Sequence, residues 1–235
     1  MSNIAIIAAA GNGERFNYYH SKMLAKILDK PVLAYTLDQF ENSEVIDEIV
    51  LVVHPKDLQH IEDEIIKRYE YTKIASIVLG GLTRQESVYF GLKSIKNKDG
   101  IACIHDGARP LVEKWMIEET VGMIDSCDGA IMAIPVIETI KKVFLQDCLV
   151  EKTVNRDEYW IVQTPQTFKL NYIRKLYQKA QEEGLKTTDD ASIVEHFGGD
   201  VKIVKSNREN IKITTSVDML LAEIIMKKRS KQKND

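Results

Sequence analysis

The amino-acid sequence predicts an α/β fold, in which helices cover both faces of a mostly parallel, twisted β-sheet. Two observations carry this prediction. Short apolar runs alternate with segments of helical apolar spacing through residues 1–135. The runs, such as Ile4–Ala9 and Ile49–Val53, are continuously apolar rather than alternating, which is typical of parallel strands buried on both faces. Repeated strand–helix–strand units favour right-handed crossovers.

The individual elements follow from apolar spacing and from boundary residues. Pro31 begins the first helix, and Pro55 ends the second strand. Helices are expected over 32–40, 57–69, 85–96, 115–123, 172–183, 189–197 and 217–228. Strands are expected over 4–9, 49–53, 76–79, 101–104, 130–135, 201–204 and 211–214.

Residues 136–155 have a different pattern. Two β-rich stretches with Thr, Lys and Val flank a turn at Asp147-Cys148, and they interrupt the α/β alternation. We expect this segment to project as a β-arm over about 136–158. The whole chain is otherwise expected to form one domain over 1–230, with residues 229–235 as a frayed, solvated tail.

Composition narrows the class of protein. The 235 residues include 32 Lys and Arg against 35 Asp and Glu, so the net charge of −3 argues against duplex nucleic acid as a partner. A small anionic ligand needs only a local cluster of cations. No apolar run reaches the roughly 18 residues of a membrane helix, and no signal peptide is visible. Cys103, Cys127 and Cys148 are odd in number and form no CxxC, so we expect reduced thiols in a soluble cytoplasmic protein.

The stretch AIIAAAGNGERF (residues 5–16) indicates a strand that opens into a glycine loop, where backbone N–H groups can meet an anion. It lacks the Lys-Ser or Lys-Thr of a Walker A loop. It also departs from a dinucleotide fingerprint, since Phe16 replaces the third glycine and His54 stands where an acid would end the next strand. A plain tight turn therefore stays possible. Arg15 and Lys22 add two cations to the loop, a composition that suits a triphosphate.

Three predicted strands end in glycine or polar motifs: Gly11-x-Gly13, Gly80-Gly81 and His105-Asp106. The carboxyl ends of parallel strands lie at one edge of a sheet, so this edge is the expected site. Asp106 suits Mg²⁺, which takes one or two carboxylates plus phosphate oxygens, although a turn aspartate is equally compatible. His105 is more consistent with a structural role than with a general base.

Other motifs leave alternatives open. GGLTRQESV (80–88) fits either a backbone approach to a flat base or an ordinary strand-to-helix turn. Asp189-Asp190 suits a helix N-terminus better than a metal pair. Lys212, flanked by apolar residues in a strand-like pattern, is either a phosphate ligand in a cleft or a solvent-facing lysine.

Taken together and in order, eight segments resemble the 2-C-methyl-D-erythritol 4-phosphate cytidylyltransferases of the isoprenoid pathway. They are AAAGNGERF, the Lys22 segment, GGLTRQESV, HDGARP, PVIETIKKV, QTPQTF, TDDASIVE and NIKITT, over about residues 4–225. The resemblance implies a Rossmann-like nucleotidyltransferase fold with a β-arm that exchanges across a homodimer. It also implies CTP, a polyol phosphate and Mg²⁺ as ligands, with diphosphate released.

The resemblance also implies roles for single residues, carried over by position. Those expected to line the cytidine pocket are Ala8, Ala9, Ala10, Gly11, Gly13, Gly81 and Ser87. Those expected to hold the triphosphate and the reacting phosphorus are Arg15, Lys22 and Lys212, with Asp106 beside the metal. Those expected to meet the sugar phosphate are Arg109, Thr139, Arg156 and Thr164, with Thr139 and Arg156 supplied by the partner's arm.

This sequence departs from the family pattern in three places. Ser21-Lys22-Met23 stands where Pro-Lys-Gln is common, and Lys26 is near enough to compete with Lys22. Leu82 replaces a polar residue after the double glycine, so base contacts would be mainly through the backbone. Gly107 replaces the usual alanine, which would loosen that turn.

The implied chemistry needs no general base, because the nucleophile is an anionic phosphate monoester that attacks the α-phosphorus in line. Two rival functions share the fold. Cytidylyl transfer to ribitol 5-phosphate is one, and the ARP and TDDA segments favour the erythritol branch over it. A non-catalytic nucleotide-binding module is the other, and the joint presence of Arg15, Lys22, Asp106 and Lys212 argues against it.

Overall fold

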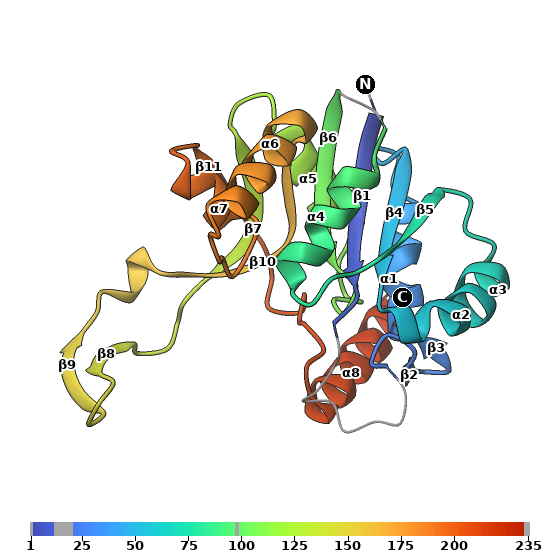
Figure 1. Cartoon of the computed structure of the whole chain (residues 1–235). Helices are drawn as coiled ribbons and strands as arrows, with labels where there is room; N and C mark the ends of the chain where they lie inside the picture. Colours follow the sequence, from blue (N-terminus) through green and yellow to red (C-terminus); the bar gives the residue numbers. More distant parts are fainter. Residues whose placement is uncertain (1, 12–20, 97–98, 233–235) are drawn as a thin grey trace.

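The fold is built around a seven-stranded sheet in the order β11-β7-β10-β6-β1-β4-β5 (Figure 1). This computed structural model describes residues 2–11, 21–96 and 99–232. The strands are β1 (Ser2–Ala9), β4 (Glu48–Val53), β5 (Ile74–Leu79), β6 (Gly100–Asp106), β7 (Gly129–Pro135), β10 (Trp160–Lys169) and β11 (Val201–Lys205). All neighbours pair in parallel except β10, which is antiparallel to both β6 and β7. The predicted mostly parallel sheet is thus confirmed.

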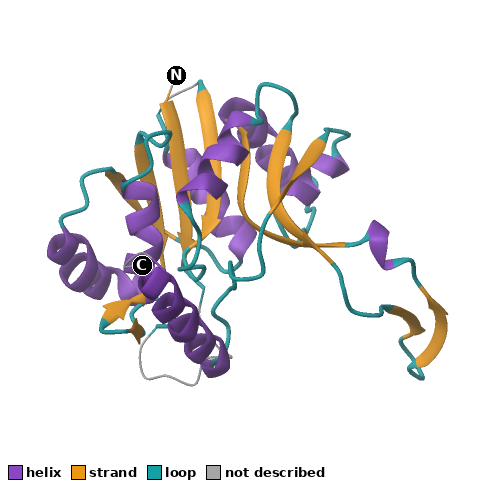
Figure 2. Cartoon of the chain, turned by 180° about the vertical axis from the view of Figure 1, so that it is seen from behind, coloured by secondary structure: helices purple, strands orange, loops and turns teal. Residues whose placement is uncertain are grey.

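Helices cover both faces of this sheet (Figure 2). One apolar cluster joins the sheet to α1 (Val32–Glu41), α5 (Lys114–Gly122) and α8 (Ser216–Gln232). A second cluster, on the other face, joins it to α4 (Arg84–Ser94), α6 (Leu170–Glu182) and α7 (Ala191–His196). The remaining helical stretch contains α2 (Leu58–Ile61), a π-helical turn (Glu62–Ile66) and α3 (Lys67–Tyr69).

Strand β1 shows why the apolar runs are continuous. Ile4 and Ile6 pack into one cluster, whereas Ala5, Ile7 and Ala9 pack into the other, and all five are fully buried. Successive side chains of a strand point to opposite faces, so a strand covered on both sides needs apolar residues at every position.

Helix α4 lies close to β1 and β4 because of Gly91. A Cβ atom there would come within 2.9 Å of methyl groups of Ile6 and Val52. The start of α4 is fixed by a capping box, in which Thr83 and Glu86 each accept from the other's backbone N–H. The first turn of α4 is thereby held against the carboxyl ends of the central strands.

The predicted arm lies between β7 and β10. It contains β8 (Lys141–Phe144) and β9 (Leu149–Thr153), which pair only with each other, followed by a 3₁₀ turn (Arg156–Glu158). The arm projects away from the body of the chain (Figures 1 and 2). Its large apolar side chains at Val143, Phe144, Leu145, Leu149 and Val150 are 38–89% exposed.

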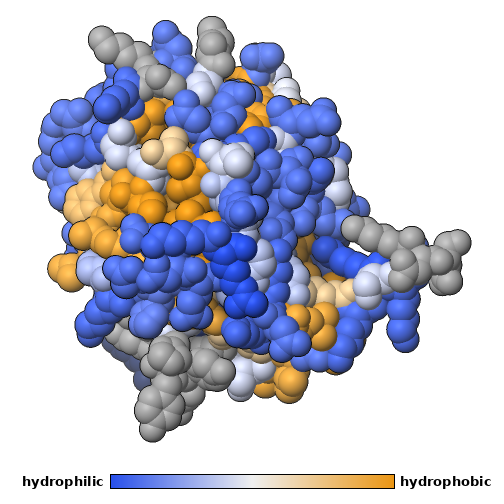
Figure 3. Space-filling model, turned by 90° about the vertical axis from the view of Figure 1, so that its right-hand side faces the viewer, coloured by the Kyte–Doolittle hydropathy of each residue, from blue (hydrophilic) through white to orange (hydrophobic). Residues whose placement is uncertain are grey.

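Strand β5 forms one edge of the sheet. Seen from the side on which β5 lies in Figure 1, the surface is mainly hydrophilic with an apolar area on part of it (Figure 3). The exposed apolar side chains at this edge include Leu79 and Leu82, which flank the turn that leads from β5 into α4. No helix in the described ranges has the length and apolar character needed to cross a membrane.

Three features differ from the sequence-based expectations. Strand β10 was not predicted, because proline normally argues against an inner strand. In the structure Pro165 follows a cis peptide bond within β10, and the register with β7 shifts between Val162 and Gln166. The strand predicted over 211–214 is a loop, a prediction that was therefore wrong. The tail expected to fray from residue 229 is instead helical through Gln232, since Arg229 pairs with Glu113 and Glu209; residues 233–235 lie outside the described part.

Candidate functional site

Two cavities open at the carboxyl ends of the central strands, at the edge that the sequence predicts. The first has a volume of about 340 Å³. Its walls come from the end of β1, the loop before α4, the end of β6 and the loop before α8. The lining residues are Ala8, Ala10, Gly11, Lys22, Met23, Gly81, Leu82, Thr83, Arg84, Ser87, Asp106, Ala108, Lys212 and Thr214.

Most residues predicted for the nucleotide and the triphosphate therefore meet in the first cavity. The exception among those described is Ala9, whose side chain is fully buried in the core on the other face of β1. Gly13 and Arg15 lie outside the described residues. Lys26, the possible competitor of Lys22, is exposed on the short strand β2 (Lys26–Ile27) and does not line the cavity. Its partner β3 (Lys30–Pro31) leads directly into α1.

The second cavity, of about 420 Å³, adjoins the first. Its lining residues are Arg84, Asp106, Arg109, Val162, Gln163, Thr164, Gln166, Thr188, Asp189, Ser192, Glu195 and Lys212. Arg109 and Thr164, predicted to meet the sugar phosphate, are among them. Thr139 and Arg156 lie exposed on the arm instead and line neither cavity.

Three charged residues, Arg84, Asp106 and Lys212, line both cavities, and we call them the junction. Arg84 Nε donates to Asp106 Oδ1 at 2.8 Å, and Lys212 Nζ lies 2.7 Å from Asp106 Oδ2. Arg109 Nε is 3.7 Å from the same Oδ2. Burial raises the pKa of the Asp106 carboxyl, but these three cations outweigh it and hold the pKa well below its usual value. Asp106 is therefore an anion at neutral pH.

The loop that carries Lys212 is held by hydrogen bonds rather than by a sheet. Asn210 Nδ2 donates to Gln163 Oε1 at 3.0 Å and to the carbonyl oxygen of Thr164 at 2.9 Å. Ile213 N–H donates to the carbonyl oxygen of Ala108 at 2.8 Å. Lys22 Nζ reaches the carbonyl oxygen of Ile213 at 3.4 Å. These bonds place both lysines at the same cavity, although 190 residues separate them (212 − 22).

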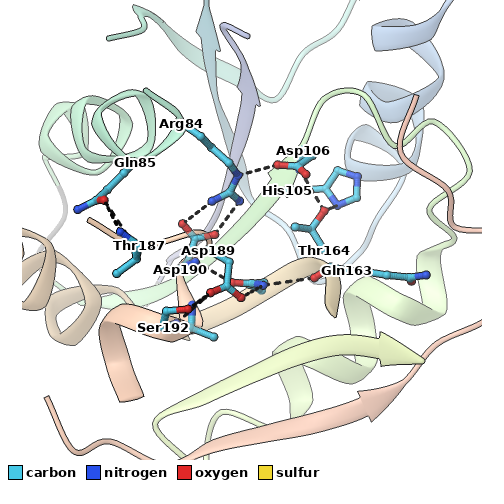
Figure 4. Close-up of polar contacts among 12 residues, drawn as sticks. Arg84, Gln85, His105, Asp106, Gln163, Thr164, Thr187, Asp189, Asp190 and Ser192 are labelled. Carbon is cyan, nitrogen blue, oxygen red and sulfur yellow. Dashed lines mark hydrogen bonds and ion pairs between the residues drawn. The ribbon is translucent and has the colours of Figure 1, made fainter. Parts of the chain in front are cut away.

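His105 is structural, as its sequence context indicates. Burial lowers the pKa of its imidazole to about 3, so the ring is neutral. Its Nε2 lies 3.3 Å from the carbonyl oxygen of Arg109, which can only accept, and this makes Nδ1 the unprotonated nitrogen. The Thr164 hydroxyl, 3.0 Å from Nδ1, then donates to His105 and accepts from the N–H of Asp106 (Figure 4).

The two acids at residues 189 and 190 are both occupied by protein donors. Asp189 Oδ1, just before the N-cap residue Asp190, accepts from Ser192 N–H at 3.1 Å, so this acid lies at the start of α7 as expected. Asp190 is fully buried and bonds to both terminal nitrogens of Arg84. Within the described ranges no group of three or more His, Cys, Asp or Glu could hold a metal ion.

Sequence reasoning missed Arg84. A weak signal was present, because a cation in the first turn of a helix is disfavoured by the helix dipole and needs a compensating partner. Here the compensation comes from Asp106 and Asp190, which lie 22 and 106 residues further along the chain.

The family model of 2-C-methyl-D-erythritol 4-phosphate cytidylyltransferase (IspD) matches residues 3–228. The protein of that name from Clostridium acetobutylicum is 41% identical to this chain, over 98% of this chain and 100% of its own length. The one from Alkaliphilus oremlandii is also 41% identical, over 97% of this chain and 98% of its own length.

Solved structures agree. The 4-diphosphocytidyl-2C-methyl-D-erythritol synthase of Anaerococcus prevotii superposes with a TM-score of 0.85 at 33% identity, over 96% of each chain. The Francisella tularensis 2-C-methyl-D-erythritol 4-phosphate cytidylyltransferase gives 0.79 at 31% identity, over 94% of this chain and 98% of its own. With the strand order, the two adjoining cavities and the motifs that line them, these matches show that the chain belongs to the 2-C-methyl-D-erythritol 4-phosphate cytidylyltransferase family.

Proposed function

We propose that the first cavity binds CTP and that the second binds 2-C-methyl-D-erythritol 4-phosphate. The enzyme, a nucleotidyltransferase by family, then transfers CMP to the acceptor phosphate and forms 4-diphosphocytidyl-2-C-methyl-D-erythritol and diphosphate. The observation that carries this proposal is the junction. Because Arg84, Asp106 and Lys212 line both cavities, an acceptor phosphate in one and an α-phosphorus in the other would meet beside them.

The chemistry is assigned to charge and orientation rather than to proton transfer. The acceptor phosphate is already anionic, so in-line attack on the α-phosphorus needs no base. Lys22 and Lys212 both line the first cavity, which supports assigning them to neutralise negative charge as it builds on the phosphoryl oxygens. Arg15 is assigned the same role by the resemblance alone, since it lies outside the described residues.

Small residues suit the first cavity to a flat base. Ala8, Ala10, Gly11 and Gly81 form part of its wall, and the neighbouring Gly80 could not carry a Cβ, which would lie 2.2 Å from the Cβ of Ala10. Ser87 Oγ accepts from Gly81 N–H at 3.1 Å and so fixes the turn. Gly13 is assigned to this wall by position only.

Arg109 supports an anion in the second cavity. Its side chain is 12% exposed, and its Nε has no hydrogen-bond acceptor among the described residues, with Asp106 Oδ2 at 3.7 Å. A buried guanidinium donor without an acceptor favours a phosphate oxygen as its partner. Thr164 contributes less directly, because the hydrogen of its hydroxyl is directed to His105.

Mg²⁺ fits the donor set at the junction. Asp106 supplies one carboxylate, and Lys212 already places a cation against its Oδ2. Mg²⁺ commonly binds one or two carboxylates together with substrate phosphates, so a single aspartate is sufficient when the triphosphate supplies the remaining oxygens. When bound, the ion would supply charge neutralisation at the phosphates.

The arm supports a homodimer. Thr139 and Arg156 are assigned to the acceptor phosphate, yet the arm that carries them projects from the body of its own chain (Figure 1), and neither residue lines a cavity of that chain. In a two-fold dimer each arm would reach the partner's second cavity and bury its exposed apolar residues. The three free cysteines support a reducing, cytoplasmic location.

The function is tested by incubating the protein with CTP and Mg²⁺ and either 2-C-methyl-D-erythritol 4-phosphate or ribitol 5-phosphate. Diphosphate release with the erythritol phosphate is expected. Release with ribitol 5-phosphate alone would replace the proposed acceptor. Calorimetric binding of CTP with no diphosphate from either acceptor would point to a non-catalytic nucleotide-binding module.

A further inference from the structure

Arg84 joins three parts of the site through one guanidinium (Figure 4). From the first turn of α4 its Nε donates to Asp106 Oδ1 at 2.8 Å, at the end of β6. Its Nη1 and Nη2 donate to Asp190 Oδ1 and Oδ2 at 3.0 and 2.8 Å, at the start of α7. A planar fork that uses three nitrogens on two carboxylates has no freedom to rotate, so it fixes both acids relative to α4.

The Asp190 end of this contact is rigid. Asp190 is fully buried, and its carboxylate also accepts from the hydroxyl of Tyr177. Gln166 Oε1 accepts from the backbone N–H groups of Asp190 and Ala191, both at 3.0 Å. Asp190 therefore anchors the guanidinium of Arg84, and the anchored guanidinium fixes the position of Asp106 through the bond from its Nε.

The two oxygens of Asp106 consequently differ. Oδ1 is bonded to Arg84, a planar group anchored elsewhere. Oδ2 meets the ammonium of Lys212, whose side chain is 36% exposed, against 25% for Arg84. Arg109 Nε lies 3.7 Å from Oδ2 and makes no hydrogen bond to it. A lysine ammonium is a point charge on a flexible stem and exchanges more readily than a forked guanidinium. Oδ2 is thus the oxygen that an incoming cation or phosphate group can reach.

We propose that Arg84 is a positioning residue for the reaction: it holds Oδ1 of Asp106 so that Oδ2 stays directed to the junction, where a divalent cation takes the place of Lys212. This inference rests on the proposed function and on Mg²⁺ at Asp106. It assigns Arg84 no contact with the reacting atoms. Lys212, once displaced from Oδ2, is free to turn to the phosphates.

The test separates this role from simple support of the fold. Arg84→Gln alone would leave two carboxylates near each other without their shared cation, so it is combined with Asp190→Asn, which removes the buried charge. Asp190→Asn alone is the matched control, because it keeps the bond from Arg84 to Asp106. Arg174→Gln is a second control, since Arg174 bonds to the C-terminal end of α4 through carbonyl oxygens of Leu92 and of the C-cap residue Ile95.

Two readouts are measured: the Mg²⁺ concentration for half-maximal diphosphate release, and Mn²⁺ binding to the protein with CTP by electron paramagnetic resonance. In the double variant the half-maximal Mg²⁺ concentration and the Mn²⁺ dissociation constant are both expected to rise about 10- to 100-fold over those of Asp190→Asn. The fold decrease in kcat is expected to be larger than the fold change in KM for CTP. In Arg174→Gln the two constants are expected to stay within about threefold of wild type, as for a change outside the metal's surroundings. In Asp190→Asn, which weakens the anchor of Arg84 but keeps its bond to Asp106, they are expected to lie between those of wild type and those of the double variant.

Equal constants in the double variant and Asp190→Asn would overturn the proposal. Should the double variant fail to unfold cooperatively, Arg84→Lys replaces it. One ammonium cannot bond Asp106 and Asp190 as the fork does, so wild-type constants in that variant would also overturn the proposal. A wild-type protein that releases no diphosphate refutes the proposed function instead, while Mn²⁺ binding still tests Arg84.

Discussion

Lys212 Nζ lies 2.7 Å from Asp106 Oδ2, between the two cavities. We predict that Lys212→Ala lowers the rate of CMP transfer about 100- to 1000-fold, because one cation that would neutralise the reacting phosphoryl group is lost. Steady-state diphosphate release measures this. Lys205→Ala is the control, since Lys205 is exposed on β11. Turnover near the wild-type rate in Lys212→Ala would remove this residue from the mechanism.

Lys22 and Lys26 offer a second matched pair. Lys22 lines the first cavity, whereas Lys26 is exposed and lines neither. We predict a loss of about 100- to 1000-fold in rate for Lys22→Ala and almost none for Lys26→Ala. The same assay decides, and the opposite ranking would mean that Lys26 is the loop lysine that contacts the triphosphate. Arg15→Ala is expected to match Lys22→Ala.

Sharing of the active site between subunits can be tested by complementation. Lys212→Ala is expected to inactivate the site through its cavity, and Arg156→Ala through the arm that reaches the site. When the two inactive variants are co-expressed, half of the dimers are mixed and each mixed dimer holds one intact site, so roughly one quarter of wild-type activity should return. Lys212→Ala with Lys22→Ala is the control, because both residues line one cavity of one chain and no intact site can form. Absence of recovery in the first mixture would place Arg156 at its own chain's cavity.

Gly107 stands where alanine is usual in the family pattern, and substitution tests whether this departure affects stability. A Cβ there would lie 3.1 Å from Ala9 Cβ and from Leu33 Cδ1, and small shifts can relieve both contacts. We predict that Gly107→Ala changes the free energy of unfolding by less than about 1 kcal/mol, since lost flexibility of the unfolded chain offsets the contact. Gly91→Ala should cost about 1–3 kcal/mol, because Ile6 and Val52 lie at 2.9 Å on two buried strands. Urea denaturation compares the two, and equal costs would contradict this packing.

His105 makes stability depend on pH. Burial lowers the pKa of His105 from 6.5 to about 3, and the charged groups around it are Asp106, Arg109 and Arg84. Below pH 6.5 the unfolded chain binds a proton that the folded chain does not, so this contribution to stability is complete above pH 6.5 and is lost as the pH falls toward 3.

Between pH 6.5 and pH 5 this single group should cost about 2 kcal/mol of unfolding free energy. Urea denaturation at both pH values, for wild type and for His105→Gln, isolates the effect as the difference between the two proteins. A variant whose stability falls as steeply as that of wild type would show that His105 is not the group responsible.

Local patterns predicted most of the fold because each depends on neighbouring residues. Ile4–Ala9 and Ile49–Val53 are apolar at every position since both sheet faces are covered. Strand β10 escaped prediction because its proline and register shift break the local pattern, while pairing with β6 and β7 supplies the compensation. Residues 211–214 gave the opposite error: their apolar spacing is that of a strand, yet they pair with no strand in the described part of the chain. The N–H of Ile213 donates to Ala108 in a distant loop, whereas those of Ile211 and Thr214 donate locally, to Glu209 and to the Asp218 side chain.

By itself, the sequence predicted the α/β class and the edge of the sheet at which the two cavities open, because short strands, glycine turns and charged motifs are local properties. The family resemblance added most residues of the first cavity. The tertiary structure decided how the charges pair. Arg84, Asp106, Asp190 and Lys212 come from four separate segments, and their ion pairs exist only once β6, α4, α7 and the loop before α8 are packed together. Distance and burial set the strength of those pairs, and neither is a property of a linear pattern.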